Sequence, residues 1–146
     1  MCCAALLALA AICARSPALA QTISGRATVI SGDTLEIRGD RIRLMGVDAP
    51  ADDLVCESTD DHRYRCGQRA VGALDIFLEE SVVTCAGRER DSAGQLMALC
   101  SANGTDLGLW LVRNGFALDR PDGSRYRQAQ EQAKAAQKGI WSARPR

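Results

Sequence analysis

The 146-residue sequence predicts a single α+β domain whose short strands curl into a partly closed barrel with helices packed on it. The length suits one domain, and no low-complexity tract or long linker divides the chain. Hydrophobic residues make up 47% and charged residues 25% of the chain, which excludes disordered and fibrous proteins. The pattern of apolar residues then predicts the element order βββ-α-ββ-α-α.

The first three strands are predicted from β-branched residues and turn signals. Residues 26–37 read RATVISGDTLEI, in which Ser31-Gly32-Asp33 interrupts the run and divides it into two strands. A turn at residues 38–41 then leads into a third strand over residues 42–47. We expect these three strands to pair in antiparallel order.

The second half of the chain predicts three helices and one more strand pair. The helices are expected from apolar stripes and from glycines beyond their ends, and the strands from β-rich runs around a glycine-containing turn. An acidic loop is expected from Pro50 to Asp61. The expected elements are a helix over 66–79, strands over 81–86 and 95–101, a helix capped by Thr105 and ended by Gly115, and a helix over 124–138 that stops at Gly139.

Five short strands cannot hide their edges in a flat sheet. A curled, partly closed barrel covered by helices solves this problem. We therefore predict a five-stranded OB-type β-barrel with three helices.

The N-terminal segment is typical of a signal peptide. Residues 4–14 are almost wholly apolar, and Ala18-Leu19-Ala20 is a small-x-small cleavage pattern. Eleven apolar residues are too few for a membrane span, which needs about 20. The expected organisation is a signal peptide over residues 1–20 and one domain over residues 21–146. This predicts export to the periplasm or the medium, and no membrane attachment of the mature protein.

Export would leave four cysteines in an oxidising compartment: Cys56, Cys66, Cys85 and Cys100. Three pairings of four cysteines are possible. We favour Cys56 with Cys66 and Cys85 with Cys100, because each pair closes a local segment. A metal site is the competing interpretation, but the chain has no CxxC, and its single His62 lies in a polar stretch typical of a surface.

Four landmarks together resemble the staphylococcal nuclease (thermonuclease) family over nearly all of residues 24–141. The landmarks are Val29-Ile30-Ser31-Gly32-Asp33-Thr34, Arg43-Leu44-Met45-Gly46-Val47-Asp48-Ala49-Pro50, Leu111-Val112-Arg113-Asn114-Gly115-Phe116-Ala117 and Lys138-Gly139-Ile140-Trp141. The segment from Cys66 to Ala70, with the preceding Cys56, looks like exported bacterial members. The resemblance implies an OB barrel, three helices and calcium-assisted hydrolysis of DNA and RNA.

The resemblance also implies a set of site residues. Asp33 and Asp48 match the two metal carboxylates of the family, and the backbone carbonyl of Ala49 matches a third ligand. Such oxygen ligands suit a hard cation such as Ca²⁺. Arg43 matches a catalytic arginine that stabilises charge on the reacting phosphate.

Two catalytic positions of the family are substituted in this chain. The glutamate that handles the attacking water is Ala51 here, and the second active-site arginine is Gln95. Rescue by a neighbouring side chain would require Asp52 or Asp53 to replace the carboxylate. Arg88 or Arg90 would have to replace the guanidinium. Different backbone positions argue against this rescue, because small displacements of catalytic groups cost activity.

Two functions of different classes follow. The first is an exported nuclease-like hydrolase with weak or lost activity, which at the limit is a pseudoenzyme. The second is a non-catalytic module of the cell envelope that binds a polyanion or a protein. We expect nucleic acid or another polyanion as the partner, and a monomer. The aromatic side chains Phe77, Trp110, Phe116 and Trp141 lie in apolar settings and are expected to pack in the core rather than against bases.

Overall fold

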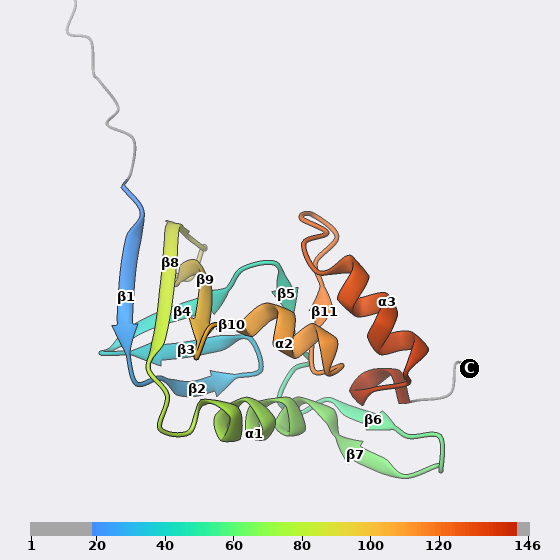
Figure 1. The fold of residues 1–146 in the computed structure, drawn as a ribbon. Coiled ribbons are helices and arrows are strands. Elements are labelled where there is room, and N and C mark those ends of the chain that lie inside the picture. The colour runs from blue at the N-terminus through green and yellow to red at the C-terminus, as the bar shows by residue number, and fades with distance from the viewer. Residues whose placement is uncertain (1–18, 143–146) are drawn as a thin grey trace, which may run out of the picture.

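The computed structural model describes residues 19–142, in which a curled sheet wraps around a buried core (Figure 1). The strand order of the main sheet is β1-β8-β9-β4-β3-β2, and β10 pairs with β9 outside this path. Nearly all of the expected signal peptide lies outside the described residues. The strands of the main sheet are β1 Gln21–Gly25, β2 Thr28–Ser31, β3 Thr34–Ile37, β4 Asp40–Leu44, β8 Val83–Arg90, β9 Leu96–Ala102 and β10 Thr105–Asp106.

The three strands expected in the N-terminal half are confirmed. Strands β2, β3 and β4 pair in antiparallel order, and Thr34 of β3 lies opposite Arg43 of β4. The β3–β4 turn has positive φ at Arg38 (54°) and Gly39 (85°), as a tight hairpin requires. The third strand ends at Leu44, earlier than expected, because Gly46 adopts a φ of 82° and turns the chain.

The expected strand pair of the C-terminal half is also confirmed. Strands β8 and β9 pair in antiparallel order, and β9 pairs in parallel with β4. This parallel pair joins the two antiparallel groups into one curled sheet, which confirms the α+β, OB-type fold. The structure adds β1, which pairs with β8 and had no expected counterpart.

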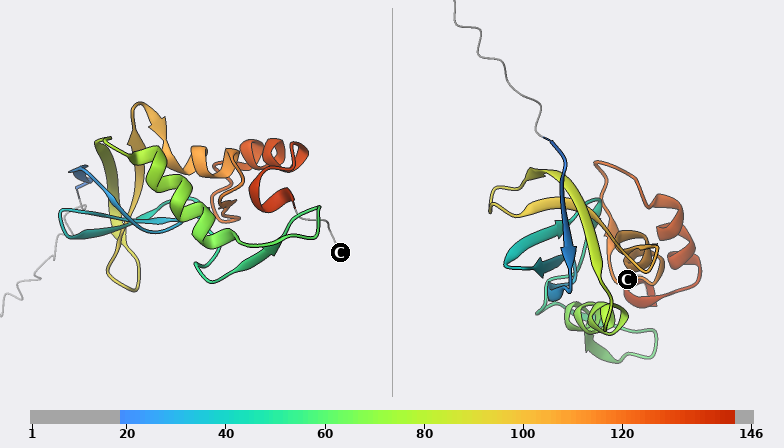
Figure 2. Two further views of the ribbon diagram at one scale, coloured as in Figure 1. Left: turned by 90° about the horizontal axis from the view of Figure 1, so that it is seen from below. Right: turned by 60° about the vertical axis from the view of Figure 1, so that its left-hand side comes forward.

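Three helices accompany the sheet: α1 Cys66–Leu78, α2 Leu107–Arg113 and α3 Arg127–Ala135, followed by a 3₁₀ turn at Gly139–Ser142. Figure 2 shows α1 along one side of the sheet, where it contacts β2, while α2 and α3 pack together. The expected cap of α2 is wrong by one residue: the side chain of Asp106, not Thr105, accepts a hydrogen bond from Leu109 N at 2.9 Å. Thr105 lies in β10 instead.

The last helix is shorter than expected at both ends. Ser124 adopts a left-handed φ of 45°, so α3 cannot begin there, and it starts at Arg127. At the other end Gln137 adopts a φ of 50°, which ends the helix before Gly139. The expected terminator at Gly115 is confirmed for α2, since Gly115 has a φ of 71° directly after the C-cap Asn114.

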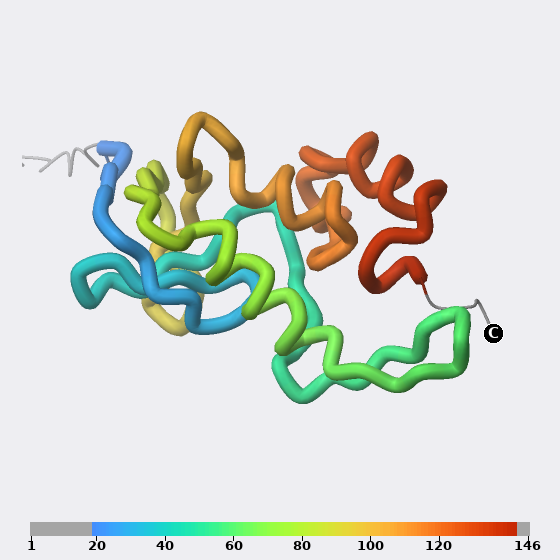
Figure 3. Tube along the Cα trace, turned by 60° about the horizontal axis from the view of Figure 1, so that its bottom comes forward, coloured from blue at the N-terminus to red at the C-terminus, as the bar shows by residue number. Residues whose placement is uncertain are grey.

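Two small strand pairs complete the fold. Strand β5 (Val47–Asp48) pairs with β11 (Leu118–Asp119). Strand β6 (Val55–Glu57) pairs with β7 (Arg63–Arg65). The β6–β7 hairpin extends beyond the start of α1, as the tube view shows in green (Figure 3). The acidic segment expected as a loop therefore contains a strand.

Both favoured disulfides are confirmed, Cys56–Cys66 and Cys85–Cys100. The first ties the β6–β7 hairpin to the start of α1. The second joins directly opposed residues of β8 and β9 inside the core.

The core lies inside the curl of the sheet and under the helices. The expected core packing is confirmed for three of the four aromatic rings: Phe77 stacks on Trp110 with ring centres 4.4 Å apart, and Phe116 contacts Trp110 at 5.6 Å. Trp141 is half-buried and lies outside the core cluster. Among residues 19–142, no helix is both long and apolar enough to span a membrane. The largest fully buried side chains are Leu35, Ile37, Ile42, Leu74, Leu96, Leu107, Leu111, Val47, Val83, Val112 and Cys85.

Candidate functional site

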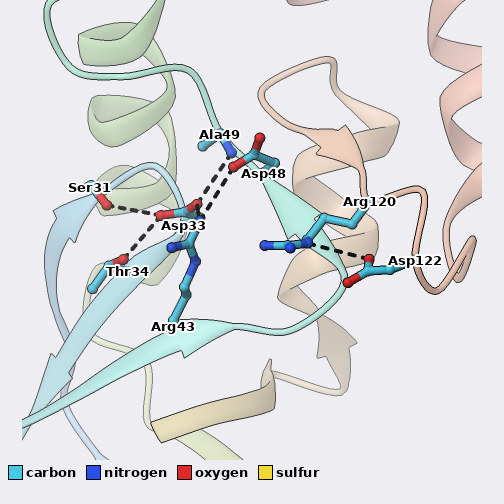
Figure 4. Close-up of polar contacts among 8 residues, drawn as sticks. All are labelled: Ser31, Asp33, Thr34, Arg43, Asp48, Ala49, Arg120 and Asp122. Atoms are coloured by element: carbon cyan, nitrogen blue, oxygen red, sulfur yellow. Dashed lines mark hydrogen bonds and ion pairs between the residues drawn. The ribbon is translucent and has the colours of Figure 1, made fainter. Parts of the chain in front are cut away.

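Asp33 lies in the tight turn between β2 and β3, and its carboxylate is almost fully buried. The residue is 8% exposed, so the charge requires polar partners. Its Oδ1 accepts hydrogen bonds from the hydroxyls of Ser31 at 3.1 Å and Thr34 at 3.0 Å (Figure 4). Its Oδ2 faces the other way, toward Arg43 and the backbone N–H of Ala49. One carboxylate oxygen is thus held by the turn, while the other is directed into the site.

Arg43 connects the two carboxylates predicted from the sequence. Its Nη2 lies 3.3 Å from Asp33 Oδ2 and 3.4 Å from Asp48 Oδ1. The Asp48 side chain is 58% exposed and lies on the solvent side of the site. The Nε of Arg43 is buried and has no hydrogen-bond partner among the described residues.

The backbone explains why these three residues meet. Because Thr34 pairs with Arg43 across β3 and β4, the Asp33 turn lies at the level of Arg43. A bond from Leu44 N to Asp33 O, at 2.8 Å, fixes this register. Gly46 then reverses the chain, and the pairing of β5 with β11 holds Asp48 at the edge of the site. Three chain segments therefore converge on one point.

The carboxylate oxygens of this site are the type of donor that a hard cation prefers. Asp33 Oδ2 and Asp48 Oδ1 face a single positively charged nitrogen, so two oxygens from separate chain segments can approach one cation. Residues 19–142 contain no group of three or more His, Cys, Asp or Glu side chains that could hold a metal, so these two carboxylates would need additional oxygen ligands. For Ala49, the contact seen is a bond from its N–H to Asp33 at 3.4 Å.

Ala51, which the resemblance aligns with the catalytic glutamate, carries only a methyl group. Its backbone oxygen accepts a hydrogen bond from Leu54 N at 2.9 Å and lies against Gly67 of α1. Asp52 and Asp53 are exposed, and neither forms a hydrogen bond or ion pair in the described part of the chain. The nearby aspartates therefore do not reach into the site in this structure.

Gln95, which the resemblance aligns with the second active-site arginine, lies in the turn between β8 and β9. Its backbone N–H donates to Asp91 at 2.9 Å, which holds the turn. Arg90 is occupied elsewhere, because it donates to Gly94 O at 2.8 Å and to the Gln21 side chain at 3.3 Å. Arg88 is exposed on β8 and makes no ion pair within residues 19–142. Neither arginine occupies the Asp33–Arg43–Asp48 site.

Sequence reasoning missed one cationic residue beside this site. Arg120 follows β11 directly, and Figure 4 shows its guanidinium directed toward the side on which Arg43 and Asp48 lie. Arg120 and Asp48 line the same cavity of about 450 Å³. The sequence signal was weak, because the two-residue pairing of β5 with β11 has no recognisable pattern. His62, by contrast, is exposed as predicted.

Comparisons with known proteins agree with this architecture. A family model described as staphylococcal nuclease homologue matches residues 41–143. The succinoglycan biosynthesis protein ExoI of Rhizobium meliloti (strain 1021) is 42% identical over 130 residues, which cover 86% of this chain and 68% of that relative. The chain therefore belongs to the family of staphylococcal nuclease homologues.

Proposed function

We propose that this protein is an exported, nuclease-like phosphodiesterase whose hydrolysis of nucleic acid is weak or lost. Residues 1–20 are the proposed signal peptide, and residues 21–146 the mature, monomeric domain. One observation carries the proposal: Asp33, in the β2–β3 turn, and Asp48, in β5, converge on Arg43, in a family that generally binds nucleic acids.

Each retained residue has a proposed role. Asp33, Asp48 and the carbonyl of Ala49 would hold Ca²⁺, which when bound would supply positive charge beside the phosphate. Arg43 would donate hydrogen bonds to the phosphate oxygens as charge develops on them. To do so, its guanidinium would exchange its contacts with the two carboxylates for contacts with the substrate.

The two substitutions explain why we propose low activity. Ala51 cannot take a proton from water, and general-base assistance is typically worth about 10²- to 10⁴-fold. Gln95 is neutral, whereas an arginine at a transferring phosphoryl group is worth about 10³- to 10⁵-fold. These factors do not simply multiply, since groups that act as a unit fail together. Loss of either one still predicts a large fall in turnover.

A cleavage assay tests this proposal directly. The purified mature protein is incubated with single-stranded DNA and with RNA, in Ca²⁺ and in a chelator. We expect slow or undetectable cleavage that requires Ca²⁺. Turnover at ordinary nuclease rates would contradict the proposed impairment.

Restoring the two missing groups tests the retained half of the site. The double substitution Ala51→Glu and Gln95→Arg should create Ca²⁺-dependent cleavage if Asp33, Asp48 and Arg43 retain their roles. The same double variant carrying Arg43→Ala is the matched control and should remain inactive. A restored variant that folds and does not cleave would refute the proposed roles of the retained residues.

A non-catalytic module of the cell envelope is the second candidate. It is favoured by Ala51 and Gln95 and by a relative whose description concerns succinoglycan biosynthesis rather than nucleic-acid cleavage. Such a module would bind a polyanion or a protein without cleaving it. Salt-sensitive binding without turnover would support it, whereas rapid turnover would exclude it.

Export is tested separately. Expression of the full chain in a Gram-negative host, followed by N-terminal sequencing, should give a mature protein beginning at Gln21. Recovery of this protein from the periplasm or the medium would distinguish the two destinations. An uncleaved chain in the cytoplasm would refute the signal peptide.

A further inference from the structure

Arg120 is held beside the site by its backbone. Strand β11 pairs with β5, so that Leu118 lies opposite Asp48. The next residue after this pairing is Arg120, whose N–H donates to Gly46 O at 3.0 Å. The chain segment that positions Asp48 therefore also positions Arg120, and Figure 4 shows the guanidinium directed into the space beside Asp48.

The guanidinium of Arg120 is available to a ligand. Its side chain is 36% exposed, and its one ion pair among the described residues joins Nε to Asp122 at 3.4 Å. Asp122 is itself 70% exposed, so this pair is weak. Arg43, in contrast, is shared between two carboxylates. Of these two cations, Arg120 can therefore accept a new anionic partner at the lower cost.

A cavity next to Arg120 has the size and lining of a ring-binding site. Its volume is about 450 Å³, within the range of small-molecule sites, which is roughly 300 to 1,000 Å³. Leu118, Pro121 and Trp141 give it an apolar lining, and Gln130 adds an amide. Asp48 and Asp119 also line it, and Asp119 accepts a hydrogen bond from Tyr126 N. Such a cavity accommodates an aromatic base attached to a charged group.

We propose that Arg120 binds a phosphate of a single-stranded nucleic acid, next to the phosphate that faces Arg43, and that the cavity holds the attached nucleoside. Arg120 then supplies, from a different element, the positive charge that the chain lacks at Gln95. This inference rests on the proposed function for its substrate class, but it concerns binding and does not require turnover.

Three single substitutions separate the roles of the charges. Arg120→Ala removes the proposed phosphate contact. Asp122→Asn removes the competing carboxylate and leaves Arg120 free. Arg125→Ala is the matched control, because it removes the same charge from the same loop but faces the cavity between α2 and α3. Circular dichroism and thermal unfolding check that each variant is folded.

Binding is measured by fluorescence anisotropy with a labelled ten-nucleotide oligothymidylate in Ca²⁺, at several salt concentrations. We expect Arg120→Ala to weaken binding about fivefold or more and Asp122→Asn to strengthen it, with less than a twofold effect of Arg125→Ala. The slope of log K against log salt should fall by about 0.7 in Arg120→Ala, as loss of one phosphate contact requires. Equal effects of Arg120→Ala and Arg125→Ala, or an unchanged slope, would overturn the proposal.

Two further measurements test the cavity and the replacement of charge. An abasic oligonucleotide of the same length should bind about fivefold more weakly than oligothymidylate. Equal affinity would overturn the assignment of the cavity. Adding Gln95→Arg to the Arg120→Ala variant should restore binding if an arginine at either position supplies the same positive charge. No restoration would refute this equivalence.

Binding through Arg120 and the proposed catalytic function can each fail without the other. Tight binding that depends on Arg120, without cleavage by the restored Ala51→Glu and Gln95→Arg variant, would refute the retained catalytic roles and support the role of Arg120. Ca²⁺-dependent cleavage with no effect of Arg120→Ala on affinity would do the reverse.

Discussion

Tyr126 carries a phenol that the fold holds in its protonated form. The side chain is buried and donates to both carboxylate oxygens of Asp106, at 2.9 Å and 3.1 Å. Burial first, and then the hydrogen bond to Asp106, raises the pKa of Tyr126 from 10.0 to about 12. The folded protein therefore binds this proton more tightly than the unfolded chain does.

This shift predicts a loss of stability at high pH. The contribution of Tyr126 to the free energy of unfolding is complete below about pH 10 and is lost as the pH rises toward about 12. Urea unfolding of the wild type and of Tyr126→Phe should show a stability difference that shrinks over this interval. A difference that stays constant from pH 9 to pH 12 would contradict the shifted pKa.

Asp33 is the residue on which a bound cation would depend most. If Ca²⁺ binds there, it stabilises the folded state by about 1.4 kcal/mol at a concentration ten times its Kd. The melting temperature of the wild type should therefore rise with added Ca²⁺, and that of Asp33→Asn should not. Asp52→Asn, which removes an exposed carboxylate that has no partner among residues 19–142, should keep the rise. An equal rise in both variants would rule out Asp33 as a ligand.

At the scale of residues, the prediction of the site went beyond what local patterns in the sequence could support. The proximity of Asp33, Arg43 and Asp48 was inferred through resemblance to a family, because nothing local in the sequence says which distant residues meet. Arg120 was missed for the same reason. Its position depends on the pairing of β5 with β11, two residues on each side, which leaves no periodic signal.

At the scale of elements, the first turn of α1 packs closely against the chain segment that contains Ala51. A Cβ atom built on Gly67 would lie 1.9 Å from the backbone oxygen of Ala51, whereas one built on Gly72 would meet nothing within 4 Å. The first turn of α1 thus fixes the position of Ala51 through a contact that only glycine permits.

This difference predicts opposite effects of one substitution at two positions of the helix. Gly67→Ala should destabilise the protein by about 2 kcal/mol or more, because the backbone of one element must move. Gly72→Ala should stabilise it by about 0.5 to 1 kcal/mol through helix propensity. Chemical denaturation of both variants measures this. Similar effects of the two substitutions would contradict the close contact at Gly67.

The elements predicted correctly were those with strong local signals. Strands β2, β3 and β4 combine β-branched residues with glycine turns, and α1 has a clear apolar stripe. Strand β1 was missed because its sequence, QTISG, is short and mostly polar, and its stability derives from pairing with β8. The start of α3 was placed too early because a left-handed Ser124 cannot be recognised from composition.

At the scale of the whole molecule, the two disulfides join parts of the fold that differ in burial. Cys85 and Cys100 are 0% and 3% exposed and link two central strands. In the Cys56–Cys66 bond, Cys66 is equally buried, at 3% exposed, but lies outside the core cluster, and Cys56 is half-buried in a projecting hairpin. Each closes a loop that the chain-entropy model values at about 3 kcal/mol.

The position of Cys85 and Cys100 in the core cluster predicts unequal costs when the disulfides are removed. The pair Cys85→Ala and Cys100→Ala should lower the free energy of unfolding more than the pair Cys56→Ala and Cys66→Ala, because it also leaves a cavity in the core. Thermal and urea unfolding of the two double variants give the comparison. Equal costs, or a larger cost at the hairpin, would contradict this.

Strand β1, close to the N-terminus, forms one edge of the main sheet. Its register with β8 begins at Gln21, whose side chain also accepts a hydrogen bond from Arg90. A protease that cuts between Ala20 and Gln21 leaves the pairing whole. One that trims a few residues further removes this edge strand and moves the edge of the sheet from β1 to β8. The position of such a cut would thus determine whether the five-residue β1 or the longer, eight-residue β8 forms this edge of the sheet.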